Sequence, residues 1–303
     1  MEGQEPAEVG KPIRGAGIDT RLLLQAIVSG LLTGGVYALM GVGLNLIFGV
    51  MKIINFAHGS LMMIAMYAVY WLFTLLGIDP YVSLLITVPL LFLIGLVVER
   101  LLISPIMDYP ENNQLVVTLG LMLFLESFAL FLWTPDFRTV KVSYVGAIIP
   151  LFGIRISLLR LIAFAGGLFL ALLLYIFLKK SDFGKAIRAA SEEREGAAAV
   201  GISVRTVNLI SFGVGTACVG AAGCLIAPFF YLSPYVGRLF LLTTFMVVVM
   251  GGLGSFAGAL VGAFLIGITE SLGALLLPGS IGQIIPFLLF IMVLLFKPTG
   301  LFK

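Results

Sequence analysis

One strongly charged stretch separates two apolar runs of membrane length: KKSDFGKAIRAASEEREGAAAVGISVR, residues 179–205. Charged residues make up only 11% of the chain, 33 in all, and ten of them fall in this stretch. Six of these ten are basic, and short loops rich in Lys and Arg stay on the cytoplasmic side of a membrane. We therefore predict a cytoplasmic segment at residues 179–206 of a membrane-embedded chain.

The same stretch carries the signals of short helices. Asp182 is an expected N-cap, several alanines favour helix, and Gly201 suits a left-handed position at a helix end. Gly196 is expected to divide the stretch into two pieces. A polar, alanine-rich helix held between two spans has little reason to cross the bilayer, so it is well placed to bind a partner.

The composition indicates an all-α polytopic membrane protein. Hydrophobic residues make up 60% of the 303, 24 of the residues are Phe, and the mean hydropathy is +1.16, more apolar surface than a soluble domain of this size hides. The net charge of +3 argues against nucleic-acid binding, and the single His excludes a His-based metal cluster. No phosphate-binding Walker motif occurs, so we expect neither an enzyme nor a cofactor in this chain.

The apolar runs predict eight or nine transmembrane helices, at least one of them broken. A disordered polar tail is expected at residues 1–20 and one transmembrane domain at residues 21–303. The run at 239–250 is too short to cross at about 1.5 Å per residue. The predicted runs are residues 22–48, 61–76, 82–98, 114–133, 158–178, 207–230, 239–250, 259–277 and 281–296.

Two glycine-containing segments interrupt these runs, one in each half of the chain. Irregular backbone at membrane depth is tolerated only where protein or a water-filled cavity surrounds it, and paired interruptions point to the substrate path of a transporter. The path candidates are Asn55, Phe56, His58, Gly59, Ser60, Gly251, Gly252, Gly254 and Ser255. The alternative is that both segments are tight turns at the membrane edge.

Four polar residues within or beside the apolar runs have alternative interpretations. His58 either gates the path or is a hydrogen-bonded structural residue, and Asn55 can instead cap the following helix. Glu126 and Glu270 are acids inside apolar spans, where burial of a charge is costly. They either act in proton coupling or lie near the interface or pair with a neighbouring helix.

Three motifs resemble LivH-type permeases, the membrane subunits of ABC importers for branched-chain amino acids. They are GVYALMGVGLNLIFGVMKIINFAHGSLMM (35–63), GKAIRAASEEREGAAAVGIS (184–203) and VVVMGGLGSFAGALVGAFLIGITESL (247–272), and INFAHG within the first is the most specific. The resemblance extends over about residues 22–303. It implies an ABC importer permease of the inner membrane, working by alternating access in which the helices near both interruptions shift.

The resemblance also implies partners. These are a second, related permease subunit, two cytoplasmic ATPase subunits that hold ATP and Mg, and an extracytoplasmic solute-binding protein. A coupling helix within residues 184–202 would dock on an ATPase; the coupling candidates are Gly184, Lys185, Arg188, Ala189, Glu192, Ala198, Gly201 and Ile202. Arg188 and Glu192 could instead form an i,i+4 pair on a solvated face.

Other functions stay open at this point. Permeases for urea or short amides share these motifs, and the subunit could pair with itself. A different class, an ATP-independent secondary transporter or channel, would use Glu126 or Glu270 for ion coupling and would leave the central charged helix without a purpose.

Overall fold

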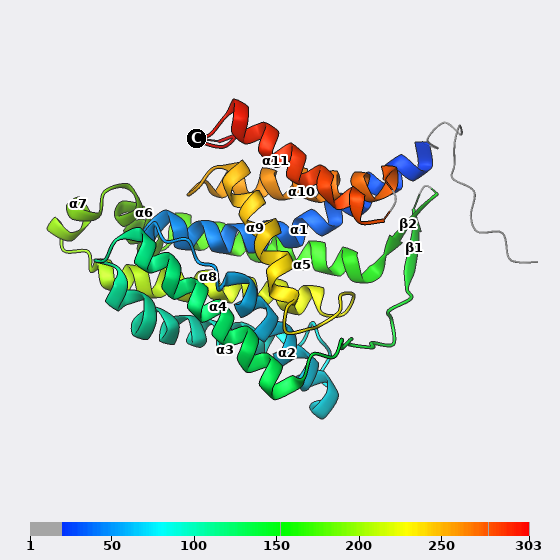
Figure 1. Ribbon diagram of the computed structural model, residues 1–303, viewed down its shortest axis with the longest axis horizontal. Helices are drawn as coiled ribbons and strands as arrows, with labels where there is room; N and C mark the ends of the chain where they lie inside the picture. Colours follow the sequence, from blue (N-terminus) through cyan, green and yellow to red (C-terminus); the bar gives the residue numbers. More distant parts are fainter. Residues whose placement is uncertain (1–19, 152, 278, 303) are drawn as a thin grey trace, which may run out of the picture.

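The fold is a bundle of apolar helices, seen in a computed structural model that describes residues 20–151, 153–277 and 279–302 (Figure 1). Seven helices in this part of the chain are long and apolar enough to cross a membrane, and two are shorter. They coincide with the nine predicted apolar runs, so the prediction of an all-α polytopic membrane protein is confirmed. Apart from Thr20, which begins the first helix, the predicted tail lies outside the described residues.

The long helices are α1 (Thr20–Met51), α2 (His58–Leu76), α3 (Leu84–Val98, counted with its continuation to Ile106), α4 (Glu111–Trp133), α5 (Leu158–Lys180), α8 (Val204–Ile226) and α10 (Phe256–Leu276). The shorter ones are α9 (Val236–Gly251) and α11 (Ile284–Phe296), which follows the 3-10 turn η3 (Gly279–Gln283). A π-helical turn, η1 (Glu99–Ile103), and a 3-10 turn, η2 (Ser104–Ile106), continue α3. The charged stretch forms α6 (Asp182–Glu192) and α7 (Arg194–Ala199).

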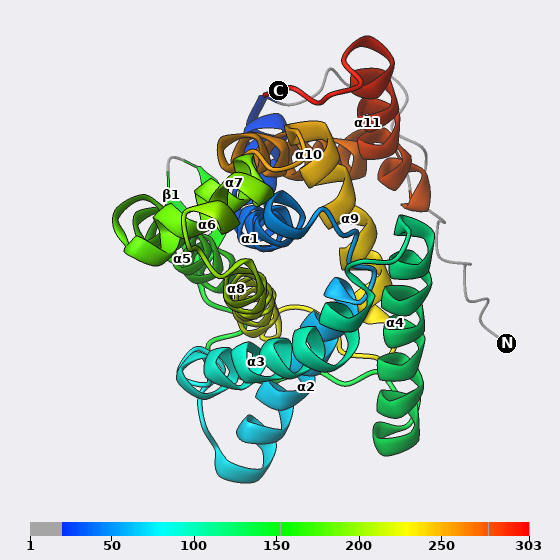
Figure 2. The same cartoon turned by 90° about the vertical axis from the view of Figure 1, so that its left-hand side faces the viewer.

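Helix α1 is the centre of the bundle, with α5, α8, α9 and α10 packed around it (Figure 2). Glycines let these backbones approach closely, as small residues do between membrane helices. A Cβ added at Gly30 would lie 2.5 Å from the carbonyl oxygen of Gly267 on α10. One added at Gly43 would lie 2.8 Å from the carbonyl oxygen of Gly215 on α8. The buried core therefore follows the length of α1.

The two ends of the bundle differ. Helices α6 and α7 lie at one end, which we call the charged end, and a β-hairpin lies at the other, the hairpin end (Figure 1). The hairpin pairs β1 (Ile148–Leu151) with β2 (Ile154–Ser157) antiparallel, Ile148 opposite Ser157. The hairpin lies between the predicted apolar runs 114–133 and 158–178, and strands of four residues with mixed polarity carry too weak a signal to be predicted. Gln25 of α1 holds the hairpin by bonds to the backbone N–H and C=O of Arg155, at 2.8 and 2.7 Å.

Two details of the charged stretch differ from prediction. The N-cap of α6 is Ser181, whose hydroxyl accepts a bond from the Gly184 N–H at 2.9 Å. Asp182 instead begins the helix, where a negative charge suits the helix dipole. The break lies at Glu193, whose extended backbone (φ −147°) interrupts the helical bonds, and Gly196 is inside α7. The left-handed position of Gly201 (φ +87°) is confirmed.

Candidate functional site

Helices α6 and α7 are attached to the bundle along one side and exposed along the other. Ile187 and Ala190 are buried, and the Ser191 hydroxyl donates to the carbonyl oxygen of Gly49 near the end of α1, at 2.9 Å. The opposite side carries exposed charges together with exposed apolar side chains, Phe183 (47% exposed) and Val200 (76%). Mixed charged and apolar exposure of this kind suits docking of another protein.

The predicted coupling residues divide between these two sides. Lys185, Arg188, Glu192, Ala198 and Gly201 are exposed, whereas Ala189 and Ile202 are half-buried. Gly184 is buried, and a Cβ there would lie 2.3 Å from the carbonyl oxygen of Leu178. It therefore sets how closely α6 packs on α5, while the exposed residues form the accessible surface.

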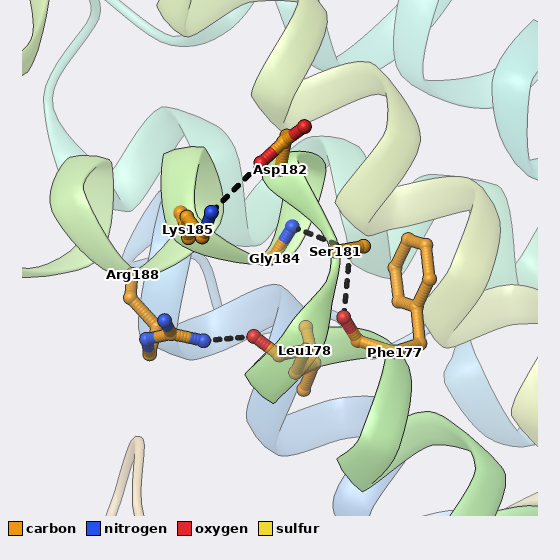
Figure 3. A network of polar contacts seen from close by, with 7 residues as sticks. All are labelled: Phe177, Leu178, Ser181, Asp182, Gly184, Lys185 and Arg188. Carbon is orange, nitrogen blue, oxygen red and sulfur yellow. Dashed lines mark hydrogen bonds and ion pairs between the residues drawn. The ribbon is translucent and has the colours of Figure 1, made fainter.

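The charged groups of α6 make local contacts at its junction with α5 (Figure 3). Arg188 donates to the carbonyl oxygen of Leu178, and in the described part of the chain it has no ion pair with Glu192. Lys185 pairs with Asp182 at 2.9 Å, and this lowers the pKa of the Asp182 carboxyl through the hydrogen bond and the nearby positive charge. Arg188 thus links α6 to the last turn of α5.

The first interruption brings the chain back beside the interior part of α1. Lys52 turns the backbone (φ +58°) after α1 ends, and α2 starts at His58, whose Nε2 lies 3.3 Å from the carbonyl oxygen of Met40. Met40 is eleven residues before the end of α1 at Met51, about 16 Å along the helix. The break therefore lies deep in the protein rather than at its edge.

Within this break, the polar residues are buried and partly bonded. Asn55 Oδ1 accepts a bond from the Ala57 N–H at 3.1 Å, so it shapes the turn into α2, although the N-cap position itself is Ala57. Asn55 Nδ2, His58 Nδ1 and Ser60 Oγ are buried without a hydrogen-bond partner among the described residues. Phe56 contacts Phe245 of α9, with ring centroids 5.6 Å apart.

The second interruption is a tight turn near the charged end. Gly252 (φ +107°) and Gly254 (φ +87°) adopt conformations that favour glycine. The buried Asn45 of α1 holds the turn: its Nδ2 donates to the carbonyl oxygens of Ser255 at 2.7 Å and Gly252 at 3.4 Å, and its Oδ1 accepts from the Gly254 N–H at 2.6 Å. Sequence reasoning missed Asn45, whose signal was a lone amide inside an apolar run.

Helix α1 lies against both interruptions. The first contacts Met40, and the second contacts Asn45. A cavity of about 480 Å³ at the charged end is lined by Asn45, Arg188, Ser191 and Gly254, among others. The coupling surface and the second interruption therefore share one cavity beside α1.

Both intramembrane acids have partners on neighbouring helices. Glu126 of α4 is 2% exposed and accepts from Arg238 of α9, with Nε–Oε1 at 2.9 Å and Nη2–Oε2 at 2.5 Å. Glu270 of α10 accepts a bond at 2.9 Å from the phenol of Tyr37 on α1. Arg238 and Tyr37 were not singled out from the sequence, because they lie 112 and 233 residues away from their partners.

Comparison with known proteins gives consistent matches. The family described as branched-chain amino acid transport system / permease component matches residues 26–294. The chain is 28% identical to the high-affinity branched-chain amino acid transport system permease protein BraD of Pseudomonas aeruginosa, over 92% of this chain and 95% of that protein. Its identity to the corresponding protein LivH of Escherichia coli is 28%, over 92% and 94%. It is 29% identical to a probable LivH of Methanocaldococcus jannaschii, over 87% of each chain. No solved structure gives a significant match.

Proposed function

The chain belongs to the family of branched-chain amino acid transport system permease components, and from this membership we propose that it is the membrane subunit of an ATP-driven importer of branched-chain and related hydrophobic amino acids. The observation that carries the proposal is the exposed α6–α7 surface at one end of an apolar helix bundle. Such a surface needs a partner outside the membrane, and the sequence has no nucleotide-binding motif of its own.

The partners follow from this arrangement. Two ATPase subunits, with their ATP and Mg, would dock at the charged end, where the basic residues of the charged stretch favour a cytoplasmic location. A solute-binding protein would deliver the amino acid at the hairpin end, and a second, related permease would complete the path through the inner membrane. The substrate for which these relatives are named supports the substrate class.

The contacts of α1 suggest how an ATPase would act on the path. Movement of α6 reaches α1 through the bond from Ser191 to Gly49. The same part of α1 carries Asn45, which holds the turn at residues 252–255. A displacement of α6 would therefore move α1 and the α9–α10 turn together, the kind of shift that opens a path alternately to either side.

The test is ATP-dependent uptake of labelled leucine into proteoliposomes containing this chain, a second permease, ATPases and a binding protein. The changed protein carries Arg188→Ala with Glu192→Ala, and the control carries Glu111→Ala with Lys141→Ala, which removes two exposed charges elsewhere. We expect uptake to collapse in the first and persist in the second, with both proteins monodisperse.

Three results would contradict parts of the proposal. Uptake without ATPases would identify a secondary carrier or channel. ATP-driven uptake of urea but not leucine would keep the importer and replace its substrate. Full uptake by the α6 variant would remove the coupling role from that surface.

A further inference from the structure

The hairpin end contains a cavity in which an arginine and a glutamate face the same space. Its volume is about 220 Å³, and its lining includes Tyr37, Arg160 and Glu270 beside apolar Phe229, Phe230 and Phe240. Arg160 also lines a neighbouring cavity of about 410 Å³, and Tyr37 and Glu270 line another of about 370 Å³. The charged residues thus lie where adjoining cavities meet.

These two charges are not neutralised by each other. Arg160 lies close enough for its charge to act on Glu270, yet no ion pair joins them in the described part of the chain. Arg160 is exposed to the cavities and makes no hydrogen bond there to a described residue. Glu270 is held from one side by the Tyr37 phenol, which binds Oε2 and leaves Oε1 available.

An acid within a membrane helix, as Glu270 is within α10, is costly to bury and by default marks a functional pathway. Arg160 lies at the mouth of the same cavity, in the first turn of α5. An α-amino acid carries a carboxylate and an ammonium group on one carbon atom. A guanidinium binds a carboxylate in a bidentate manner, and a carboxylate accepts bonds from an ammonium group. Apolar walls with a few placed polar groups are typical of small-molecule sites.

We propose that Arg160 and Glu270 form a zwitterion site at the hairpin end: Arg160 binds the carboxylate of a hydrophobic amino acid, Glu270 binds its ammonium group, and the phenylalanines of the cavity contact its side chain. Tyr37 is a positioning residue that orients Glu270. This inference rests on the proposed function and adds the residues that receive the substrate at the end where the binding protein would release it.

The test measures binding of labelled leucine to the assembled permease–ATPase complex in nanodiscs without binding protein. Two competitors each lack one charge: 4-methylpentanoate has no ammonium group, and 3-methylbutylamine has no carboxylate. Because a hydrogen bond to a charged group contributes about 1.5–3 kcal/mol, the wild type should prefer leucine over each competitor roughly ten- to a hundredfold.

The variants separate binding from structure. Glu270→Gln keeps an acceptor for Tyr37 but loses its charge, so it should lose the preference over 4-methylpentanoate and keep the preference over 3-methylbutylamine. Arg160→Gln should show the opposite pattern, and Arg160→Lys should retain both preferences in part. A merely structural role would weaken all three ligands equally. Glu111→Gln and Lys141→Gln, both at exposed positions, are the matched controls.

Several outcomes would overturn the site. They are the absence of saturable leucine binding by the wild type, equal affinities for the three ligands, or unchanged preferences in the charge-removing variants. ATP-driven leucine uptake by the complete wild-type complex is measured in parallel. If uptake is present but the binding measurements contradict the zwitterion site, the importer function stands and only the site is rejected. If uptake is absent, both the importer function and the site are rejected.

Discussion

Replacing Gly59 by alanine is expected to destabilise the protein, because α2 crosses α9 at this residue with no room for a side chain. A Cβ added there would lie 2.1 Å from the carbonyl oxygen of Gly237 and 2.9 Å from the Cβ of Leu241. The first of these atoms is backbone, so the helices must separate to admit the methyl group.

The magnitude follows from two opposing effects. Overpacking costs about 1–3 kcal/mol, and a contact this close to a carbonyl oxygen belongs at the upper end. Alanine recovers about 1 kcal/mol of helix propensity relative to glycine. The net loss is about 2 kcal/mol, which at an unfolding entropy of about 2.1 cal/mol/K per residue corresponds to a fall in Tm of about 3 °C for 303 residues.

The assay is thermal unfolding of the purified protein in one detergent, with Gly120→Ala as the control. Gly120 lies on α4 with nothing within 4 Å of an added Cβ, so this variant should keep or raise the Tm. A Gly59→Ala protein as stable as the wild type would refute the packing argument. If that stable protein also failed to transport, Gly59 would belong to the substrate path instead.

Three further predictions concern single contacts. Asn45→Ala removes the three hydrogen bonds to the 252–255 turn, each of which contributes about 1 kcal/mol. We expect a lower Tm and faster labelling of a cysteine placed at residue 253. Unchanged labelling would contradict the role of Asn45 in holding the turn. Arg238→Gln leaves the buried Glu126 unpaired and costs roughly 3 kcal/mol of stability, the low end of the usual range because Arg238 is half-exposed. The double variant Glu126→Gln with Arg238→Gln should recover part of the lost Tm. No recovery would count against the pairing. Burial, with the hydrogen bond to Asp79, raises the pKa of the Tyr144 phenol, so the stability that this contact contributes is complete below about pH 10 and is lost as the pH rises above that value. Proteolysis of loop 134–147 should therefore accelerate above about pH 10, and less so in Tyr144→Phe. Equal acceleration in both proteins would argue against this contact.

The helices were predictable from the sequence, and their partners were not. Apolar runs and the break near His58 are local signals, because each depends on residues adjacent in the chain. The bond from Asn45 to Ser255 spans 210 residues, and the pair Glu126–Arg238 spans 112. Which face of one helix meets which face of another is decided by packing, and uniformly apolar helices carry little periodicity to indicate it.

The same limit applies to the candidate site. The short helices of the charged stretch and the two helix breaks could be predicted because these segments differ in composition from their surroundings. Arg160 lies in the first turn of α5, where an arginine reads as an ordinary boundary charge. Its place in a cavity with Glu270, 110 residues later, emerges only when α5 and α10 are folded around α1.

The close glycine contact between α1 and α10 has a consequence for biosynthesis. Gly30 and Gly267 meet across 237 residues (267 − 30), so the first helix is inserted long before its main neighbour exists. At about 5–20 residues per second, the interval is roughly 10 to 50 seconds. During that time Gly30 and Asn45 of α1 lack the partners that α10 and the 252–255 turn later supply, although α5 and α8 already exist to cover other faces of α1. A nascent chain that stops before α10 would therefore leave this one face of α1 without its partner.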